Sequence, residues 1–213
     1  MTSVWGPLGW MTLHSVSTSY PENPTPSERQ LMSSWLELFR DTITCPHCKE
    51  HFGTMLQNYR MRFPNILNSR QDLAMFAFRA HNAVNARLHK PVYGSLADCM
   101  TVLKNNIKTR TAADYRISYL NHIMRFWRTI QDISGIVALK KVNEMRKIEA
   151  DYFAPRDTKF EVDLRDDNVV IPRNWVENNV EQPSQQPVVQ SAFALNANAR
   201  AGFKIVGGRM RLR

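Results

Sequence analysis

Apolar residues recur at intervals of three and four through the first half of the chain, and this spacing limits the fold more than any other feature. The clearest example runs from about Arg70 to His89, where one helical face carries Leu73, Phe76, Ala77, Ala80, Val84 and Leu88. Prolines at positions 21, 24, 26, 64 and 91 interrupt the pattern, and proline does not continue a helix interior. The region from Trp5 to about Asn106 is therefore predicted to be a set of helices joined by loops.

Two serines carry helix-start signals within this region. Ser27 is followed three residues later by Gln30, which fits a capping box opening a helix. Ser95 stands three residues before Asp98 and is expected to cap a shorter helix that extends through Leu103.

The second half of the chain differs in composition. Residues 105–113 are polar without an apolar period and indicate a linker. Tyr115 to about Tyr152 is again amphipathic, and Gly135 marks an expected break or kink. Short strands are expected over 160–164 and 169–171.

The last part of the chain is predicted to be a basic tail. Residues 181–200 are rich in Gln, Asn, Ser, Pro and Ala, a composition typical of disorder. The predicted organisation is thus an all-α domain over 1–106, a mainly helical extension over 112–176 and a disordered basic tail over 177–213.

Composition excludes several classes of protein. The longest apolar runs, such as that from Ile136 to Leu139, are too short to span a bilayer, and the first 20 residues lack the pattern of a secretory signal. Three cysteines in 213 residues exclude a disulfide-scaffolded mini-protein. The net charge of +9 favours acidic or nucleic-acid partners, although a solvated basic face is the preferred explanation, because no base-reading motif accompanies the charge.

Two of the three cysteines lie in TCPHCKEHF, residues 44–52. Pro46 fits the first turn of a helix, so this segment is predicted to open one. The free N–H groups and the dipole at a helix start favour a thiolate and lower the pKa of a cysteine there. Cys45 is therefore predicted to be the reactive, outward-facing thiol, and Cys48 the inward-facing one.

Such a pair suits several chemistries. A thioredoxin-type site needs a βαβ context, whereas the flanking residues indicate helices. Cys45, Cys48 and His51 offer three zinc ligands, which would make the chain a zinc-stabilised helical binding module, but no fourth Cys or His follows at a finger-like spacing. A dithiol facing a redox cofactor is the third interpretation, and two incidental cysteines are the fourth. The motif alone leaves these open.

Two further segments place polar groups beside apolar stripes. In AHNAVNARLHKP, His81 and Asn85 share a face and Asn82 is adjacent. Buried amides need hydrogen-bond partners, which a polar heterocyclic ligand would supply; a polar helix edge is the alternative. Near the N-terminus, Trp10 and His14 share a helical face, which suits a pocket with an aromatic wall and a hydrogen-bonding histidine.

In this order, the motifs resemble the Erv/ALR family of FAD-linked sulfhydryl oxidases. The matching positions are Trp5-Gly6, Trp10-x-x-Leu13-His14, Tyr20-Pro21, Cys45-x-x-Cys48 and His81-Asn82-x-Val84-Asn85-x-x-Leu88-x-Lys90. The resemblance covers about Val4 to Leu103. It implies four bundled helices plus a short fifth that hold FAD non-covalently, usually in a homodimer.

The resemblance also implies roles for individual residues. Cys45 and Cys48 would be catalytic, with Cys48 against the flavin ring and Cys45 meeting the dithiol of a protein substrate. Electrons would pass through this pair and FAD to O₂, giving hydrogen peroxide. No metal is expected, and the cofactor-binding residues would be Gly6, Trp10, His14, Tyr20, His51, Phe78, His81, Asn82, Val84, Asn85 and Lys90.

The sequence departs from cellular members of that family. Phe78 stands where many of them have a cysteine of a structural disulfide, so Cys99 is expected to be a free thiol. Phe76 replaces a tryptophan of the adenine pocket, and no second C-x-x-C is present as a shuttle. These features resemble the oxidases of large cytoplasmic DNA viruses, an analogy that implies action in the host cytoplasm or the virion. The extension and the tail lie outside the resemblance, and the basic tail would suit an acidic or nucleic-acid partner.

Overall fold

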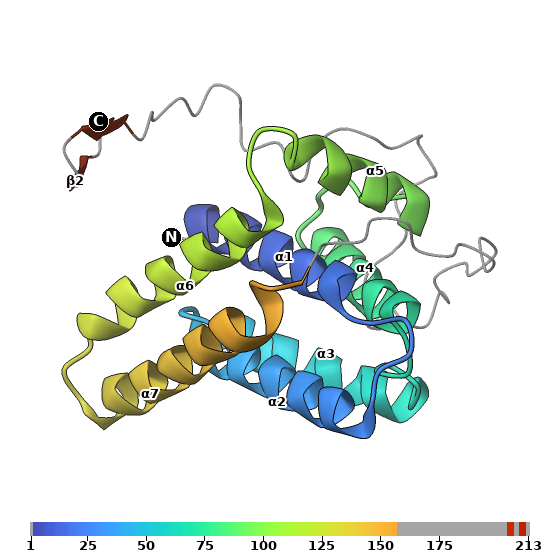
Figure 1. Cartoon of the computed structure of the whole chain (residues 1–213), viewed down its shortest axis with the longest axis horizontal. Coiled ribbons are helices and arrows are strands. Elements are labelled where there is room, and N and C mark those ends of the chain that lie inside the picture. Colours follow the sequence, from blue (N-terminus) through green and yellow to red (C-terminus); the bar gives the residue numbers. More distant parts are fainter. Residues whose placement is uncertain (1, 157–203, 207–208, 212–213) are drawn as a thin grey trace.

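The structure is a computed structural model that describes residues 2–156, 204–206 and 209–211 (Figure 1). The described helices are α1 (Thr2–Ser19), α2 (Pro26–Thr42), α3 (Pro46–Arg62), α4 (Arg70–Arg87), α5 (Leu96–Asn106), α6 (Ala112–Arg128) and α7 (Ile133–Ile148), followed by a π-helical turn, η1 (Glu149–Phe153). Strands β1 (Lys204–Val206) and β2 (Arg209–Arg211) pair antiparallel, with Ile205 opposite Met210. None of the described helices is long and apolar enough to cross a membrane.

The predicted all-α class is confirmed for the domain that carries the motifs. Helix α4 follows the apolar stripe predicted from Arg70, and Ser95 caps α5 by accepting a hydrogen bond from the Asp98 backbone N–H at 3.1 Å. The predicted linker joins α5 to α6. The strands expected over 160–164 and 169–171 lie outside the described residues.

Three local expectations differ from the structure. The capping box at the start of α2 is formed by Thr25 and Glu28, not by Ser27 and Gln30, because Pro26 already takes the first helical position. The break expected at Gly135 lies just before it, over 129–132. The two strands lie within the predicted disordered tail, where Ile205 and Val206 precede a Gly-Gly pair, a sequence typical of hairpins.

Helix α1 is the central element of the bundle. It packs against α4 and α6, while α2 packs against α3 and α7. Helices α6 and α7 form a helical hairpin that lies along α1 and α2 (Figure 1). One core cluster includes residues from α1, α2, α3, α4, α6 and α7, so the predicted extension packs onto the same core as the first domain.

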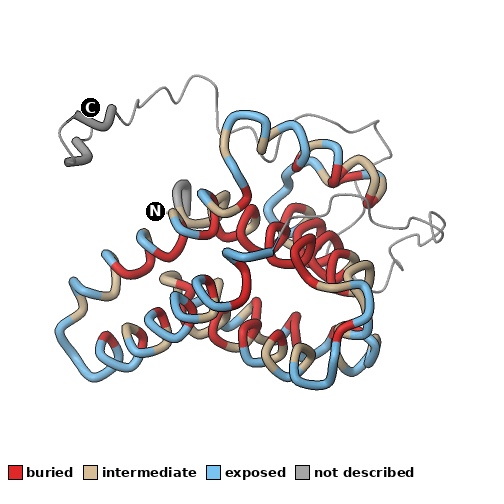
Figure 2. Tube along the Cα trace, viewed as in Figure 1, coloured by how far each residue is buried: buried red, intermediate tan, exposed pale blue. Residues whose placement is uncertain are grey.

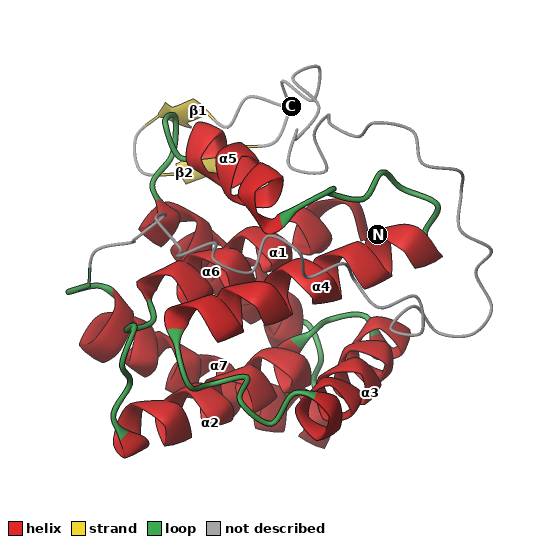
Figure 3. Cartoon of the chain, turned by 90° about the vertical axis from the view of Figure 1, so that its right-hand side faces the viewer, coloured by secondary structure: helices red, strands yellow, loops and turns green. Residues whose placement is uncertain are grey.

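Helix α5 covers a smaller apolar cluster beside α1 and α4 (Figure 3). Cys99 and Leu103 of α5 pack there with Met11 and Phe78. The helix therefore closes one end of the bundle and does not add to the main core.

Every residue of α1 from 11 to 19 is buried (Figure 2). This segment is rich in Ser and Thr, and burial of a hydroxyl without a hydrogen bond is costly. Except for Thr12, whose hydroxyl donates to the Tyr115 carbonyl of α6, the hydroxyls donate to carbonyls one turn earlier: Ser15 to Met11 at 2.6 Å, for example, and Thr18 to His14 at 3.0 Å. Because the helix satisfies most of its own hydroxyls, it can lie at the centre of the bundle.

The turn between α6 and α7 requires a glycine at position 135. A Cβ at that position would overlap the carbonyl oxygen of Ile130. The carboxylate of Asp132 caps α7 by accepting a hydrogen bond from the Gly135 N–H at 3.0 Å. Gly135 therefore allows the close approach of two backbone segments.

Replacement of Gly135 by alanine should destabilise the chain by about 1–3 kcal/mol, because the added methyl group overlaps backbone that has no free space to move into. Urea or thermal unfolding measures the loss. Gly53→Ala in α3 is the matched control. A Cβ there meets only the flexible Arg40 side chain, at 3.0 Å, and alanine gains up to about 1 kcal/mol in helix propensity. Equal stability of Gly135→Ala and the parent would contradict the close approach of Gly135 to the Ile130 carbonyl.

Candidate functional site

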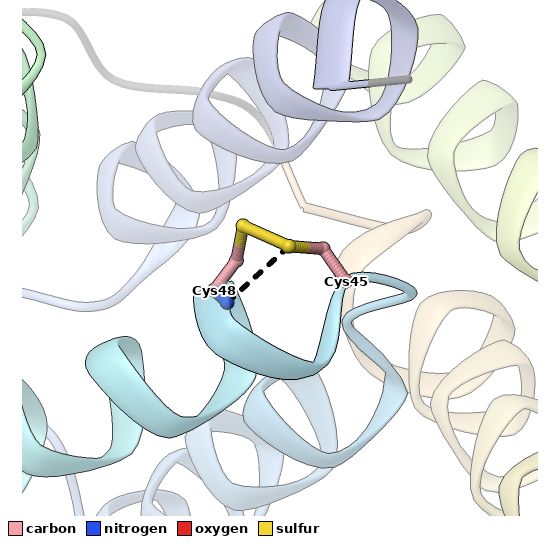
Figure 4. The surroundings of a disulfide bond; sticks show 2 residues. All are labelled: Cys45 and Cys48. Carbon is pink, nitrogen blue, oxygen red and sulfur yellow. Dashed lines mark hydrogen bonds between the residues drawn. A yellow bond between two sulfur atoms is a disulfide. The ribbon is translucent and has the colours of Figure 1, made fainter.

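The two cysteines of the C-x-x-C motif are joined at the start of α3 (Figure 4). Cys45 is the N-cap, Pro46 occupies the first helical position, and the Cys48 backbone N–H donates to Cys45 Sγ at 3.3 Å. Both cysteines are half-buried. The helix start predicted from the sequence is confirmed, and its free N–H groups favour negative charge on a sulfur at this end.

A cavity of about 380 Å³ lies beside this disulfide. Its volume is in the range of pockets that hold small molecules or parts of larger cofactors. The wall is built mainly from α1, α3, α4 and the loop that follows α4. The lining residues are Trp5, Gly6, Pro7, Gly9, Trp10, Phe39, Ile43, Cys48, His51, Phe52, His81, Val84, Asn85, Arg87, Leu88, Lys90 and Pro91.

The two cysteines differ in their relation to this cavity. Cys48 is part of the wall, whereas Cys45 is not among the lining residues. Cys45 precedes the helix, and Cys48 lies one turn further along it. One sulfur thus faces a potential ligand site, and the other is the half-buried sulfur outside it.

Stacked rings form one side of the cavity. The Trp10 indole and the His81 imidazole lie parallel, with centroids 4.3 Å apart and an interplanar angle of 8°. His81 Nδ1 lies 3.1 Å from His14 Nε2, within hydrogen-bond distance. His14 stands behind the wall, because it is fully buried and does not line the cavity.

Both imidazoles are held neutral by burial. Burial lowers the pKa of His14 to about 3. Burial, with smaller effects of His14 and Lys90, lowers the pKa of His81 well below its usual value. The pair therefore acts near neutral pH as two uncharged rings that fix the indole of Trp10 in the wall.

The third cysteine is a buried free thiol, as expected. Cys99 Sγ lies 3.9 Å from His14 Nε2. Burial raises the pKa of this thiol far above its usual range, so it stays protonated and unreactive.

The two asparagines of α4 hold the loop that follows the helix. The Asn82 amide donates to the Tyr93 carbonyl at 2.8 Å and accepts from the Tyr93 N–H at 2.9 Å. The Asn85 amide donates to the Pro91 carbonyl at 3.0 Å. The backbone thus supplies hydrogen-bond partners for these amides, which the sequence analysis expected a polar ligand to supply. Asn82 acts from behind the wall, and Asn85 is part of it.

Most predicted cofactor-binding residues meet at the cavity. Gly6, Trp10, His51, His81, Val84, Asn85 and Lys90 line it. Tyr20 and Phe78 do not. The Tyr20 hydroxyl donates to the Leu67 carbonyl at 3.0 Å, and Phe78 packs in the cluster under α5. For Tyr20, Phe78, His14 and Asn82, direct contact with a cofactor stays a prediction.

Nine lining residues, including Phe39 and Ile43 at the end of α2, were not among the predicted cofactor-binding residues. The positions of Phe39 and Ile43 depend on how α2 packs against the other helices, which no local sequence pattern predicts. Trp5 and Leu88 had a detectable signal, because both are fixed positions of the motifs that carry the family resemblance. The remaining five are Pro7, Gly9, Phe52, Arg87 and Pro91.

The buried histidines should make stability depend on pH. The folded pKa of His14 lies below its usual value of about 6.5, so the unfolded chain binds that proton first. Stability should fall as the pH drops from about 6.5 towards 3, with a slope of up to ~1.4 kcal/mol per pH unit from this group. Urea unfolding between pH 6.5 and 4 should show a shallower slope for His14→Gln. Identical slopes for His14→Gln and the parent would contradict this interpretation.

Comparison with known proteins places this arrangement in a family. Residues 8–110 match the Erv1 / Alr family. The putative FAD-linked sulfhydryl oxidase 347L of Invertebrate iridescent virus 6 is 33% identical over 92 residues, which are 42% of this chain and 83% of that protein. The putative FAD-linked sulfhydryl oxidase 096R of Invertebrate iridescent virus 3 is 34% identical over 41% of this chain and 58% of its own length.

A cellular relative matches the same part of the chain. FAD-linked sulfhydryl oxidase ERV2 of Saccharomyces cerevisiae is 31% identical over 100 residues, which are 47% of each protein. The chain thus spans about half the length of two of these three relatives. By the match to residues 8–110 and the coverage of the viral relative, the chain belongs to the Erv1/Alr family.

Proposed function

We propose that this chain is an FAD-linked sulfhydryl oxidase that forms disulfide bonds in protein substrates, with O₂ as the electron acceptor. The observation that carries the proposal is the Cys45–Cys48 disulfide at the start of α3, with Cys48 in the wall of an aromatic-lined cavity. Membership of the Erv1/Alr family and the names of the relatives, which are FAD-linked sulfhydryl oxidases, support the same activity.

The lining residues fit FAD. Trp10 and Phe52 offer flat apolar surface to a ring system, and the buried Trp5 indole N–H has no acceptor among the described residues. A heteroatom of the cofactor would supply that acceptor. Arg87 and Lys90 are exposed cations in the lining that would attract the diphosphate. When bound, FAD takes two electrons from a dithiol and passes them to O₂, giving hydrogen peroxide.

The protein's own chemistry is thiol–disulfide exchange. A substrate thiolate attacks Cys45 Sγ, the Cys45–Cys48 bond breaks, and Cys48 leaves as a thiolate. The second substrate thiolate then attacks the substrate sulfur of this mixed disulfide, which frees the oxidised substrate and the Cys45 thiolate. The substrate has lost two electrons and two protons, and the cysteine pair has gained the electrons beside the cofactor.

The order of attack follows from the site. Cys45 is preferred as the first target because it lies outside the cavity wall, whereas Cys48 is in the wall. The helix start also favours negative charge as the sulfurs become thiolates.

The setting of the reaction belongs to the proposal as well. The viral relatives support action in the host cytoplasm or the virion on viral proteins that contain dithiols. A homodimer and an acidic or nucleic-acid partner for the basic tail are proposed from the family resemblance and the net charge of +9. The Cys45–Cys48 disulfide argues against the zinc-binding alternative, because the two cysteines that it requires as ligands are bonded to each other.

The purified protein should contain FAD, consume O₂ when given dithiothreitol, and release hydrogen peroxide. Cys45→Ser and Cys48→Ser should each lower this activity by on the order of 100-fold or more, because both sulfurs take part in the exchange. An oxygen electrode measures the rate. Cys99→Ala is the matched control and should keep the parent's activity, since Cys99 is a free thiol that does not line the cavity. A flavin-containing protein whose Cys48→Ser variant keeps full activity would contradict the proposal.

Arg87 and Lys90 should strengthen FAD binding. Replacement of either by methionine should weaken the affinity roughly two- to fivefold, the effect expected for an exposed charged contact, and added salt should reduce the difference. Flavin fluorescence on release from the protein measures the affinity. Arg128→Met removes an exposed cation that is not in the lining and should leave the affinity unchanged; an equal loss in Arg128→Met would argue against a local role.

A further inference from the structure

The α6–α7 hairpin contacts Asp41 and Thr42, the residues at the end of α2 that precede the disulfide. The Trp127 indole N–H donates to the carbonyl of Thr42 at 2.9 Å. The Lys141 ammonium group pairs with the carboxylate of Asp41. The Thr42 hydroxyl lies 3.4 Å from the sulfur of Met145. These contacts come from residues beyond the part of the chain that matches the family.

The contacts act at the end of a helix, where the backbone needs partners. Thr42 is the last residue of α2, and the final carbonyls of a helix have no intrahelical donor. Trp127 supplies that donor from α6. The carbonyl of Thr42 is thus fixed by a group outside its own helix.

Thr42 lies three residues before Cys45, the N-cap of α3. Three residues span at most about 11 Å even when fully extended, so the place of Thr42 restricts the place of Cys45. Between them, Ile43 is buried and lines the cavity. Segment 43–45 is therefore short and partly buried, and the residue before it, Thr42, is held by Trp127 of another helix.

Asp41 connects the same segment to three cations. Its carboxylate pairs with Arg40 and Lys141, and its carbonyl accepts a hydrogen bond from the Lys49 side chain of α3 at 3.2 Å. Burial by itself raises the pKa of this carboxyl, but the bonds from Lys141 and Arg40 outweigh it and lower the pKa below the usual value. The carboxylate is thus ionised and available to Lys141 near neutral pH.

We propose that Trp127 and Lys141 are positioning residues for the Cys45–Cys48 disulfide. They hold the end of α2, and through the short segment 43–45 they set where the cysteine pair lies relative to the cavity wall. The α6–α7 hairpin then contributes to the thiol–disulfide site by positioning its cysteine pair. The effect on catalysis rests on the proposed oxidase function, whereas the restraint on the segment does not.

The test compares full-length Trp127→Phe and Lys141→Met with the parent. Phenylalanine keeps an aromatic ring but removes the N–H donor, and methionine keeps the chain length of lysine but removes its charge. Lys140→Met is the matched control, because Lys140 is exposed at the adjacent position and its charge forms no ion pair among the described residues.

The first measurement is amide hydrogen exchange followed by mass spectrometry. Peptides that cover residues 43–49 should exchange about fivefold faster in Trp127→Phe and Lys141→Met, as expected for the loss of one such contact. Peptides from α4 should be unchanged, which separates local release from general destabilisation. Lys140→Met should match the parent throughout. Unchanged exchange over 43–49 in both variants, or equal effects of Lys140→Met and Lys141→Met, would overturn the restraint.

The second measurement is steady-state oxidation of dithiothreitol at matched FAD content. The turnover number should fall about three- to fivefold in Trp127→Phe, with the KM for dithiothreitol and the FAD content unchanged, because Cys48 shifts within the wall while the lining residues of α1 and α4 keep their places. Faster exchange with an unchanged turnover number would overturn the role in catalysis. A parent chain that binds no FAD would refute the oxidase function instead, and hydrogen exchange alone would then decide whether the hairpin restrains the segment.

Discussion

The burial of α1 between α4 and α6 is the constraint on which the rest of the structure depends. Its inner turns can be buried because Ser15 and Thr18 donate to the helix's own carbonyls. Its outer turns supply Trp5 and Trp10 to the cavity wall. Because one helix is both the centre of the core and a wall of the site, the cavity forms only when the bundle is fully packed.

The fold and much of the site were predictable where they depend on local patterns. The apolar stripe of α4, the start of α3 at Cys45, and the helical faces that Trp10 shares with His14 and His81 shares with Asn85 follow from residue spacing within one helix. Features that depend on contacts between helices were not predictable. The partner of Asn82 is the backbone of Tyr93, eleven residues away, and the place of Phe39 in the wall depends on how α2 packs.

The α6–α7 hairpin joins the part of the chain outside the family match to the part inside it. It shares the main core with α1 and α2. The buried Arg116–Glu149 pair connects α6 to η1, the turn that follows α7, with an Nε–Oε2 distance of 2.8 Å. Removal of one partner of a buried ion pair is strongly destabilising, because the other charge is left buried without compensation. The hairpin and the bundle therefore belong to one folded unit. The disulfide lies just after the end of α2 that the hairpin contacts.

The most direct test of Cys48 as the contact between the dithiol and the cofactor is an anaerobic titration with dithiothreitol, followed by the absorption of bound flavin. The purified chain should lose its flavin absorption as the reductant is added and regain it when air is admitted, while Cys48→Ser with the same FAD content should keep its absorption throughout. A parent chain without bound flavin, or a Cys48→Ser variant bleached as fast as the parent, would contradict this arrangement.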